Sequence, residues 1–216
     1  MPPTGFIDLP PTRTDVAISK ALAGVATPGT ERMLRILTWL ADEKLMLTAV
    51  TIFWATVHLE PGSETVRREA DRMLLGVAIA GLVPHLFKRI SNRKRPDRAL
   101  VHGPRHGIPR SGDAWDSFPS GHAVHIGALA GPLLRAAPSG ARPFLGAGLA
   151  GLAATRVLLL AHYGSDVLAG LLLGAGISTA VRRFIRPGAN CHMPGELNRN
   201  AGGLTRNSSR GSVGQK

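Results

Sequence analysis

Three ionisable side chains interrupt an apolar stretch that runs from Thr155 to Asp166: Arg156, His162 and Asp166 itself. Ionisable groups in such surroundings are usually functional. A carboxylate four residues after a histidine, at the start of a helix capped by Ser165–Asp166, can hydrogen-bond one ring nitrogen and fix the tautomer. The other nitrogen is then available as a base or nucleophile. The stretch alone fits equally well a structural salt bridge between Arg156 and Asp166 beside a packed histidine.

A second group of charges lies between Lys88 and Pro119, where cations outnumber carboxylates: Lys88, Arg89, Arg93, Lys94, Arg95, Arg98, Arg105 and Arg110 against Asp97, Asp113 and Asp116. This density of cations predicts an anionic partner. Lys88 closes a predicted helix, and the proline after Arg95 favours an extended backbone there. The arginine fork can bind two phosphate oxygens. Nucleic acid is disfavoured, because the segment joins two apolar helices and lacks interleaved aromatic residues.

The segment ends with Phe118-Pro119-Ser120-Gly121-His122. The proline predicts an extended entry, the serine can cap the next helix, and the glycine lets a ligand approach the backbone. Free N–H groups and a hydroxyl would then face an anion at a helix N-terminus. His122 would lie in the first turn, a position that also suits a plain histidine at the membrane surface. His125 could form a metal pair with it, but no cysteine or third ligand has suitable spacing, so we predict no metal site.

Apolar helices must hold these groups in place. The 216 residues suggest one domain, and a formal charge of +12 accompanies 44% hydrophobic residues. Long stretches almost free of charge alternate with short arginine-rich ones, as in polytopic membrane proteins. We therefore predict an all-α fold: a polytopic membrane helix bundle of about five to six helices with its active site at one membrane face.

Five apolar runs are expected to form the bundle, over residues 45–59, 73–87, 122–134, 144–160 and 167–181. Small residues in the last three runs should allow close helix packing in lipid: Gly146, Gly148, Gly151, Gly170, Gly174 and Gly176. Before the bundle, the pattern predicts a short helix over about 14–23 and an amphipathic surface helix over about 31–45.

The chain accordingly divides into three predicted regions. Residues 1–44 would hold a disordered segment, up to residue 13, and the amphipathic helices; 45–184 would form the catalytic bundle, and 185–216 a basic, disordered tail. The single cysteine, Cys191, lies in that tail, so no internal disulfide is possible. The polar, proline-rich start predicts no cleavable signal peptide.

The three motifs have the order and internal spacing of a known signature. Lys88-x6-Arg95-Pro96, Pro119-Ser120-Gly121-His122 and Arg156-x5-His162-x3-Asp166 resemble the signature of the type 2 phosphatidic-acid phosphatase superfamily. That superfamily also includes class A bacterial acid phosphatases and vanadium haloperoxidases. The chain departs from it at Thr155, where serine is usual, and at its N-terminus, where many membrane members have another spanning helix. Its uniformly apolar helices favour the membrane branch.

The resemblance implies hydrolysis of a phosphomonoester or diphosphate through a phosphohistidine, with no metal or other cofactor. His162 would attack phosphorus, Asp166 would orient it, and His122 would protonate the leaving oxygen. Five groups would hold the phosphate oxygens: Lys88, Arg95, Ser120, Gly121 and Arg156. The residue pattern by itself leaves open which histidine is the nucleophile, and the family assigns it.

We therefore expect an integral membrane lipid phosphatase. Its lipid phosphate substrate could be phosphatidic acid, phosphatidylglycerol phosphate, or a polyprenyl phosphate or diphosphate. One alternative is a vanadate-dependent haloperoxidase that uses the same anion pocket. Another is a non-catalytic binder of anionic lipid, which would not need both histidines and Asp166.

Helix polarity predicts where the site lies. The second and fourth runs end at motifs, and the third and fifth begin at them, so the motif residues should gather at one membrane face. The other face would carry a different group of arginines: Arg67, Arg68, Arg72, Arg135, Arg142, Arg182, Arg183 and Arg186. The positive-inside tendency makes that face cytoplasmic, and the active site would face the extracytoplasmic side of the cell membrane.

Overall fold

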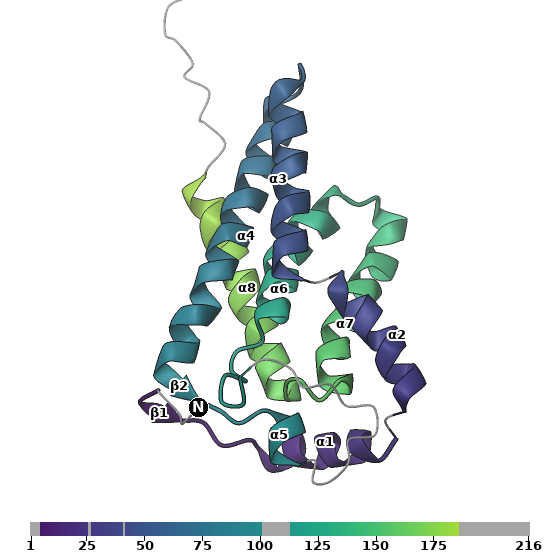
Figure 1. The fold of residues 1–216 in the computed structure, drawn as a ribbon. Helices are drawn as coiled ribbons and strands as arrows, with labels where there is room; N and C mark the ends of the chain where they lie inside the picture. Colours follow the sequence, from purple (N-terminus) through teal and green to yellow (C-terminus); the bar gives the residue numbers. More distant parts are fainter. Residues whose placement is uncertain (1–4, 26, 41, 101–112, 186–216) are drawn as a thin grey trace, which may run out of the picture. The chain divides into compact units, whose positions relative to one another are not determined.

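The computed structural model describes residues 5–25, 27–40, 42–100 and 113–185. The predictions that concern Cys191, Arg105, Arg110, Arg186 and the tail from 186 onward lie outside these residues. The fold is all-α, as predicted, with the helices arranged as Figure 1 shows: α1 (Arg13–Val25), α2 (Pro28–Trp39), α3 (Glu43–Leu59), α4 (Glu64–Ile90), α5 (Pro96–Ala99), α6 (Gly121–Ala136), α7 (Arg142–Leu158) and α8 (Gly164–Phe184). A short 3-10 turn, Ser139–Ala141, joins α6 to α7.

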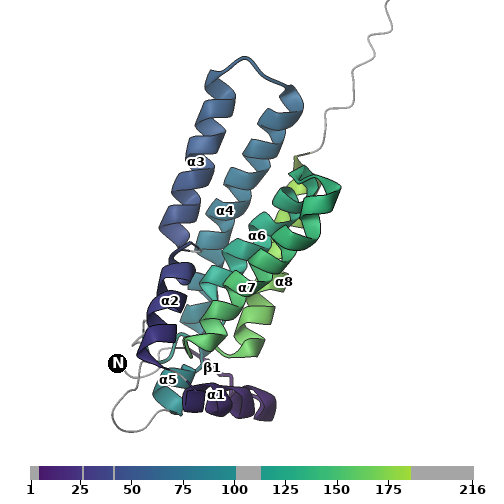
Figure 2. The same ribbon diagram turned by 90° about the vertical axis from the view of Figure 1, so that its right-hand side faces the viewer.

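The centre of the bundle is the pair α6 and α8, which lie side by side in both views (Figures 1 and 2). A Cβ at Gly174 would collide with the carbonyl oxygen of Val124, and one at Gly170 would lie 2.7 Å from that of Ser120. The predicted close packing is confirmed at these two glycines. It is wrong for Gly148, Gly151 and Gly176, where a Cβ would meet no atom within 4 Å. These three lie on helix surfaces rather than at helix contacts.

Small and β-branched residues fill the interior, and many large apolar side chains face outward. One buried cluster consists of Ala80, Val124, Ala128, Ile177 and Val181. By contrast, Leu82, Phe144 and Leu172 are 68%, 80% and 65% exposed. Exposed apolar surface of this kind is typical of a protein that contacts lipid or a partner.

The five predicted runs all form helices, namely α3, α4, α6, α7 and α8. Within the described residues, α4 and α8 are long and apolar enough to cross a membrane by length and composition. The other three have 16 or 17 residues. They fall short because a span needs about 20 apolar residues. Helix α4 starts at Glu64, well before the predicted run. The Ser63 side chain accepts a hydrogen bond from the Thr65 N–H and so caps the helix at its polar first turn.

The predicted amphipathic helix over 31–45 is instead divided between α2 and α3. Helix α2 ends at Trp39, and α3 begins at Glu43. The Asp42 carboxylate accepts hydrogen bonds from the N–H groups of Lys44 (3.0 Å) and Leu45 (3.4 Å). Aspartate is a strong N-cap, and this cap starts a new helix where the apolar spacing alone indicated continuation.

The prediction that residues 1–13 are disordered is wrong for the part that the structure describes. Strand β1 (Ile7–Asp8) pairs in parallel with β2 (Ser91–Asn92), which follows α4. The Asn92 amide donates to the Gly5 carbonyl and to the Asp8 carboxylate, both at 2.9 Å. Backbone pairing of this kind leaves no hydrophobic periodicity in the sequence.

The two ends of the bundle differ in the residues they carry. At the motif end, α4 and α7 end while α6 and α8 begin; at the arginine end, α4 begins while α6 and α8 end. At the arginine end, Arg72 donates to the Ile185 carbonyl at 3.1 Å and to Glu69 at 2.8 Å. Arg135 donates to Glu69 at 3.0 Å, so α4, α6 and α8 are tied together there.

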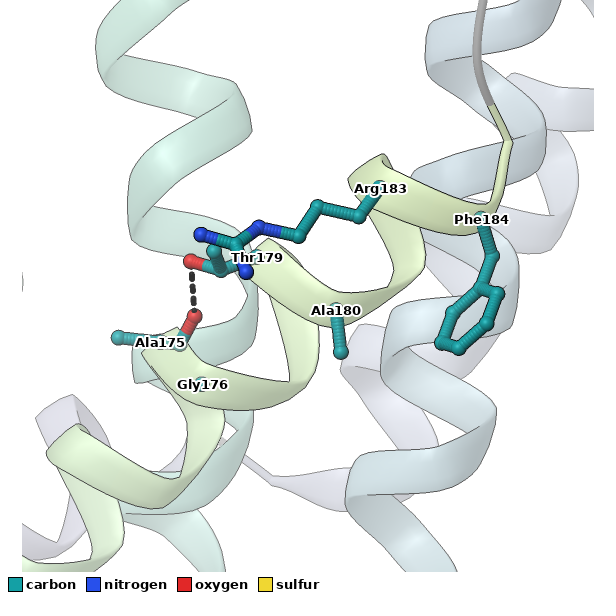
Figure 3. Close-up of a pocket in the computed structure, with 6 residues that line it drawn as sticks. All are labelled: Ala175, Gly176, Thr179, Ala180, Arg183 and Phe184. Atoms are coloured by element: carbon teal, nitrogen blue, oxygen red, sulfur yellow. Dashed lines mark hydrogen bonds between the residues drawn. The ribbon is translucent and has the colours of Figure 1, made fainter.

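A groove runs along the C-terminal half of α8, towards the arginine end (Figure 3). Its six lining residues are Ala175, Gly176, Thr179, Ala180, Arg183 and Phe184. The Thr179 hydroxyl donates to the Ala175 carbonyl of its own helix at 2.8 Å, as Figure 3 shows. None of the predicted site residues lines this groove.

Candidate active site

The motif end gathers the predicted site residues, as helix polarity predicted. Helix α4 carries Lys88 near its C-terminus, and Arg95 precedes α5. Helix α6 begins at Gly121, and the turn between α7 and α8 carries His162. In Figure 1 these segments, together with α1 and β2, lie at the same end of the bundle, and Figure 2 shows α1 and α5 at that end.

A strained turn presents His162. Leu160 has a φ of 52°, which a non-glycine residue adopts only when its surroundings hold it there. Three backbone hydrogen bonds hold the turn. The N–H groups of Ala161 and His162 both donate to the Arg156 carbonyl at 3.1 Å, and the Asp97 N–H donates to the Leu160 carbonyl at 3.0 Å. The turn is thereby fixed to both α7 and α5.

The contacts of His162 make its two ring nitrogens unlike one another. Nδ1 lies 2.7 Å from the Ser117 carbonyl oxygen, which only accepts, so Nδ1 must carry the proton. Nε2 keeps its lone pair and lies 3.5 Å from Nη1 of Arg95. Burial, together with the charges of Arg95 and Arg156, holds the pKa of His162 well below its usual value. The imidazole is therefore neutral at neutral pH, with its lone pair on Nε2.

Asp166 supports His162 less directly than predicted. Its Oδ2 lies 3.9 Å from Nδ1 of the histidine, too far for a hydrogen bond. That oxygen accepts instead from the Ser117 hydroxyl at 2.6 Å and from the Tyr163 N–H at 2.9 Å. Ser117 thus joins the two, because its hydroxyl binds the carboxylate while its carbonyl binds the imidazole. The i to i+4 spacing alone could not reveal this intermediary.

Two further predictions for Asp166 are wrong: its ion-pair partner and its role as part of the cap of α8. Its second oxygen accepts from Arg93, and the salt bridge with Arg156 that the sequence allowed does not form. The N-cap of α8 is Tyr163, rather than Ser165 or Asp166, and Asp166 completes a capping box from the first turn.

The cations of the first motif share one carboxylate. Asp116 lies 3.2 Å from Lys88 Nζ and 2.9 Å from Arg95 Nη2. Arg95 also donates to the carbonyls of Asp113 (2.9 Å) and Ala161 (3.2 Å). Backbone and side-chain acceptors thus hold the guanidinium beside His162. The sequence singled out Asp116 only as one acid in a basic segment.

The second motif offers polar groups that the protein itself leaves unused. The Ser120 hydroxyl is buried and makes no hydrogen bond with the described residues, so the predicted side-chain cap does not form. A Cβ on Gly121 would meet open space, which leaves the backbone open to a ligand. His122, the second residue of α6, is half-buried and lies within electrostatic reach of Arg156 and Lys88. Together these groups place hydrogen-bond donors at the N-terminus of α6, where an anion can bind.

Arg156 and His125 complete the surroundings. Arg156 donates to the Thr38 hydroxyl of α2 at 3.2 Å, and its buried Nε makes no hydrogen bond with the described residues. His125 is buried one turn behind His122, with Nδ1 2.9 Å from the Gly121 carbonyl. In the parts of the chain that the structure describes, no group of three or more His, Cys, Asp or Glu residues could hold a metal ion.

The sequence missed four contributors to this end of the bundle: Asp15, Thr38, Asp116 and Ser117. Asp116 and Ser117 lie within three residues of Pro119, where the second motif begins, a position that could have drawn attention to them. Thr12-x-x-Asp15 reads as a capping box, which signals a helix start but not a site. Thr38 carries no signal in the sequence.

Comparison with known proteins places the chain among phosphatases. The profile described as the PAP2 superfamily matches residues 71–187. A lipid A 1-phosphatase of Rhizobium johnstonii is 40% identical over 174 residues, which cover 76% of this chain and 69% of that protein. A decaprenylphosphoryl-5-phosphoribose phosphatase of Mycobacterium tuberculosis is 31% identical over 132 residues, covering 60% and 70%.

Two solved structures share the fold. The transmembrane PAP2-type phosphatidylglycerolphosphate phosphatase of Bacillus subtilis aligns with a TM-score of 0.58 and 22% identity, covering 79% of this chain and 84% of that one. Aquifex aeolicus LpxE aligns with a TM-score of 0.58 and 16% identity, covering 79% and 95%. At these identities the likeness concerns the fold.

Proposed function

This chain belongs to the PAP2 superfamily, and from that premise we propose that it removes the phosphate of a membrane lipid through a phosphohistidine on His162. It is a lipid phosphatase, a phosphomonoesterase. The observation that carries the mechanism is the environment of His162: a neutral, buried imidazole with Nδ1 bound to Ser117 and Nε2 facing Arg95.

The proposed reaction has two displacements at phosphorus. The Nε2 lone pair of His162 attacks, the bond from phosphorus to the lipid oxygen breaks, and His122 gives that oxygen a proton. A water molecule then attacks phosphorus, its proton passes to His122, and the bond from phosphorus to Nε2 breaks to release inorganic phosphate. Asp166 and Ser117 stabilise the positive imidazole ring between the two steps.

Charge in the proposed phosphate site supports this assignment. Lys88, Arg95 and Arg156 provide three positive charges, and the unused Ser120 hydroxyl and the Gly121 N–H provide uncharged donors. Such preorganised donors stabilise the charge that builds on the phosphoryl oxygens in the transition state. A phosphate that binds Lys88 and Arg95 must share them with Asp116 or displace it.

We expect phosphate release to survive excess chelator, because the proposed mechanism supplies every positive charge from side chains. Vanadate should inhibit, since it adopts the trigonal-bipyramidal shape of the transition state. The measurement is phosphate release from a lipid monoester by purified protein in EDTA, with and without vanadate. Loss of turnover in EDTA and its rescue by magnesium would contradict the mechanism.

The same protein can be tested for the two alternative functions. Binding of the lipid with no release of phosphate would favour a non-catalytic binder, and vanadate-dependent halide oxidation would favour a haloperoxidase.

For the substrate, we propose a phosphate monoester carried by a large lipid head group. The two named relatives act, by their names, on the 1-phosphate of lipid A and on a 5-phosphoribose attached to decaprenyl phosphate. A panel of lipid A, a polyprenylphosphoryl phosphoribose, phosphatidic acid, phosphatidylglycerol phosphate and undecaprenyl diphosphate tests this. Higher kcat/KM on the first two supports the proposal, and a preference for the diphosphate or for small glycerolipids opposes it.

We further propose that the bundle spans the cell membrane, with the motif end on the extracytoplasmic side. The exposed leucine and phenylalanine side chains and the two long apolar helices support a membrane location. Sidedness rests on the basic residues of the arginine end, among them Arg67, Arg68, Arg182 and Arg183. The cations of the motif end count less, because they bind internal carboxylates or the proposed substrate.

Cysteine labelling tests the orientation. Lys94 at the motif end and Ser139 at the arginine end are both exposed. In a Cys191→Ser background, a membrane-impermeant maleimide added to intact cells should label Lys94→Cys. It should label Ser139→Cys only after the cells are permeabilised. The reverse pattern would place the active site in the cytoplasm.

A further inference from the structure

Arg93 joins two buried carboxylates that lie far apart in the sequence. Its Nη2 donates to Asp15 Oδ2 at 2.9 Å, and its Nη1 donates to Asp166 Oδ1. The three residues are 4%, 5% and 0% exposed for Asp15, Arg93 and Asp166. The Arg93 guanidinium also lies 4.9 Å from the centre of the Tyr163 ring. One cation at the back of the proposed nucleophile thus binds an acid from α1 and an acid from α8.

Asp15 also contacts the start of α8 directly. Its carboxylate accepts from the Ser165 N–H at 3.1 Å and from the Ser165 hydroxyl at 2.7 Å. That hydroxyl in turn accepts from Arg93 Nη1 at 2.9 Å. Burial opposes the charge of Asp15, yet hydrogen bonds from Ser165 and Thr12 hold its pKa below the usual value. The carboxylate is therefore ionised at the N-terminus of the helix that carries Asp166.

We propose that Asp15 is a positioning residue for the reaction, acting through Arg93 on Asp166. This inference rests on the proposed phosphohistidine mechanism. A guanidinium can bind one carboxylate with both of its terminal nitrogens. Asp15 occupies one of those nitrogens, so Arg93 binds Asp166 through the other alone. Asp166 Oδ2 is thereby left to Ser117 and Tyr163, and Ser117 holds His162 Nδ1.

Asp15 lies outside the residues that the superfamily profile matches, 71–187. Helix α1 thus contributes, through Asp15, to positioning the proposed active site, although it precedes the part of the chain that defines the superfamily. The plain alternative is that Asp15 does no more than cap α1, since it also bonds with Thr12 there. The two accounts differ in whether the effect of Asp15 passes through Asp166.

A double-mutant cycle distinguishes a positioning role of Asp15 from a capping role. Its readout is the rate of phosphoenzyme formation from an aryl phosphate. Residues that orient metal-binding histidines and carboxylates typically contribute about tenfold to a hundredfold to activity, and we expect Asp15→Asn, which acts at the same remove from His162, to slow this step by that order. The affinity for inorganic phosphate, a ground-state ligand that the proposed cations Lys88, Arg95 and Arg156 would bind without attack by His162, should stay within about twofold of wild type. In an Asp166→Asn background, the same substitution should change the rate by less than about twofold.

Thr12→Val is the matched control. It removes the side-chain cap of α1 without touching Arg93, so it should leave the rate unchanged. If Asp15→Asn does not fold, Ser165→Ala takes its place in the cycle, because that hydroxyl links Asp15 to Arg93 without a buried charge. A wild-type rate in Asp15→Asn or its substitute, or equal slowing in both backgrounds, would overturn the inference. Absence of phosphoenzyme in the wild-type protein would overturn the proposed function instead.

Discussion

His162→Ala should abolish turnover of every substrate, whereas the effect of His122→Ala should depend on the leaving group. A nucleophile is needed whatever leaves, but a general acid matters most for a poor leaving group such as a lipid alkoxide. We expect His122→Ala to slow hydrolysis of a lipid monoester by about a hundredfold to ten-thousandfold. It should still form appreciable phosphoenzyme from an aryl phosphate, whose phenolate leaves without a proton. Steady-state assays on both substrates and a rapid acid quench measure this difference.

Asp166→Asn is the internal reference for that experiment, with an expected loss between those of the two histidine variants. The amide preserves shape, but it has a single acceptor oxygen for the Ser117 hydroxyl, the Tyr163 N–H and Arg93. Support for the charged imidazole ring is therefore weakened rather than lost. If His162→Ala formed phosphoenzyme and His122→Ala did not, the two histidine roles would be reversed.

Arg93→Met should destabilise the protein strongly, because it leaves Asp15 and Asp166 buried without their shared cation. Removal of one partner from a buried ion pair typically costs about 3–5 kcal/mol. Thermal unfolding of purified protein in detergent measures the shift.

Arg35→Met is a suitable comparison for this measurement. Arg35 pairs with Glu31 on α2; the Arg35 side chain is 62% exposed and that of Glu31 is 12% exposed. Because water screens the exposed guanidinium, such a pair contributes about 0–1 kcal/mol. We therefore expect the melting temperature of Arg93→Met to fall well below that of Arg35→Met. Similar melting temperatures would mean that the buried network adds little to stability.

The sequence predicted the parts of this molecule that depend on local pattern. Apolar runs located the five bundle helices, because burial in lipid or protein requires long uncharged stretches. Helix polarity then brought Lys88, His122 and His162 to one end with no further information. Helix ends were less accurate, since polar first turns such as that of α4 carry no apolar signal and Asp42 divides one apolar pattern into two helices.

What the sequence could not reveal are contacts between distant segments. Asp15 and Arg93 are 78 residues apart, and Arg156 and Thr38 are 118 apart. No spacing rule connects such pairs. Likewise, the i to i+4 relation of His162 and Asp166 suggested a direct hydrogen bond, yet the turn at Leu160 places the Ser117 carbonyl against the imidazole instead. The cations of the motif segment predicted an anion, but Arg93 binds internal carboxylates.

The position of the covalent phosphate shows which nitrogen of which histidine attacks phosphorus. Wild-type protein is mixed with an aryl phosphate, denatured rapidly, digested under mildly alkaline conditions and analysed by mass spectrometry and ³¹P NMR. Nδ1 of His162 donates to Ser117 and Nε2 carries the ring's lone pair, so we expect phosphate on His162 with its bond to Nε2. Phosphate on His122, on Nδ1 of His162, or on no histidine at all would contradict it.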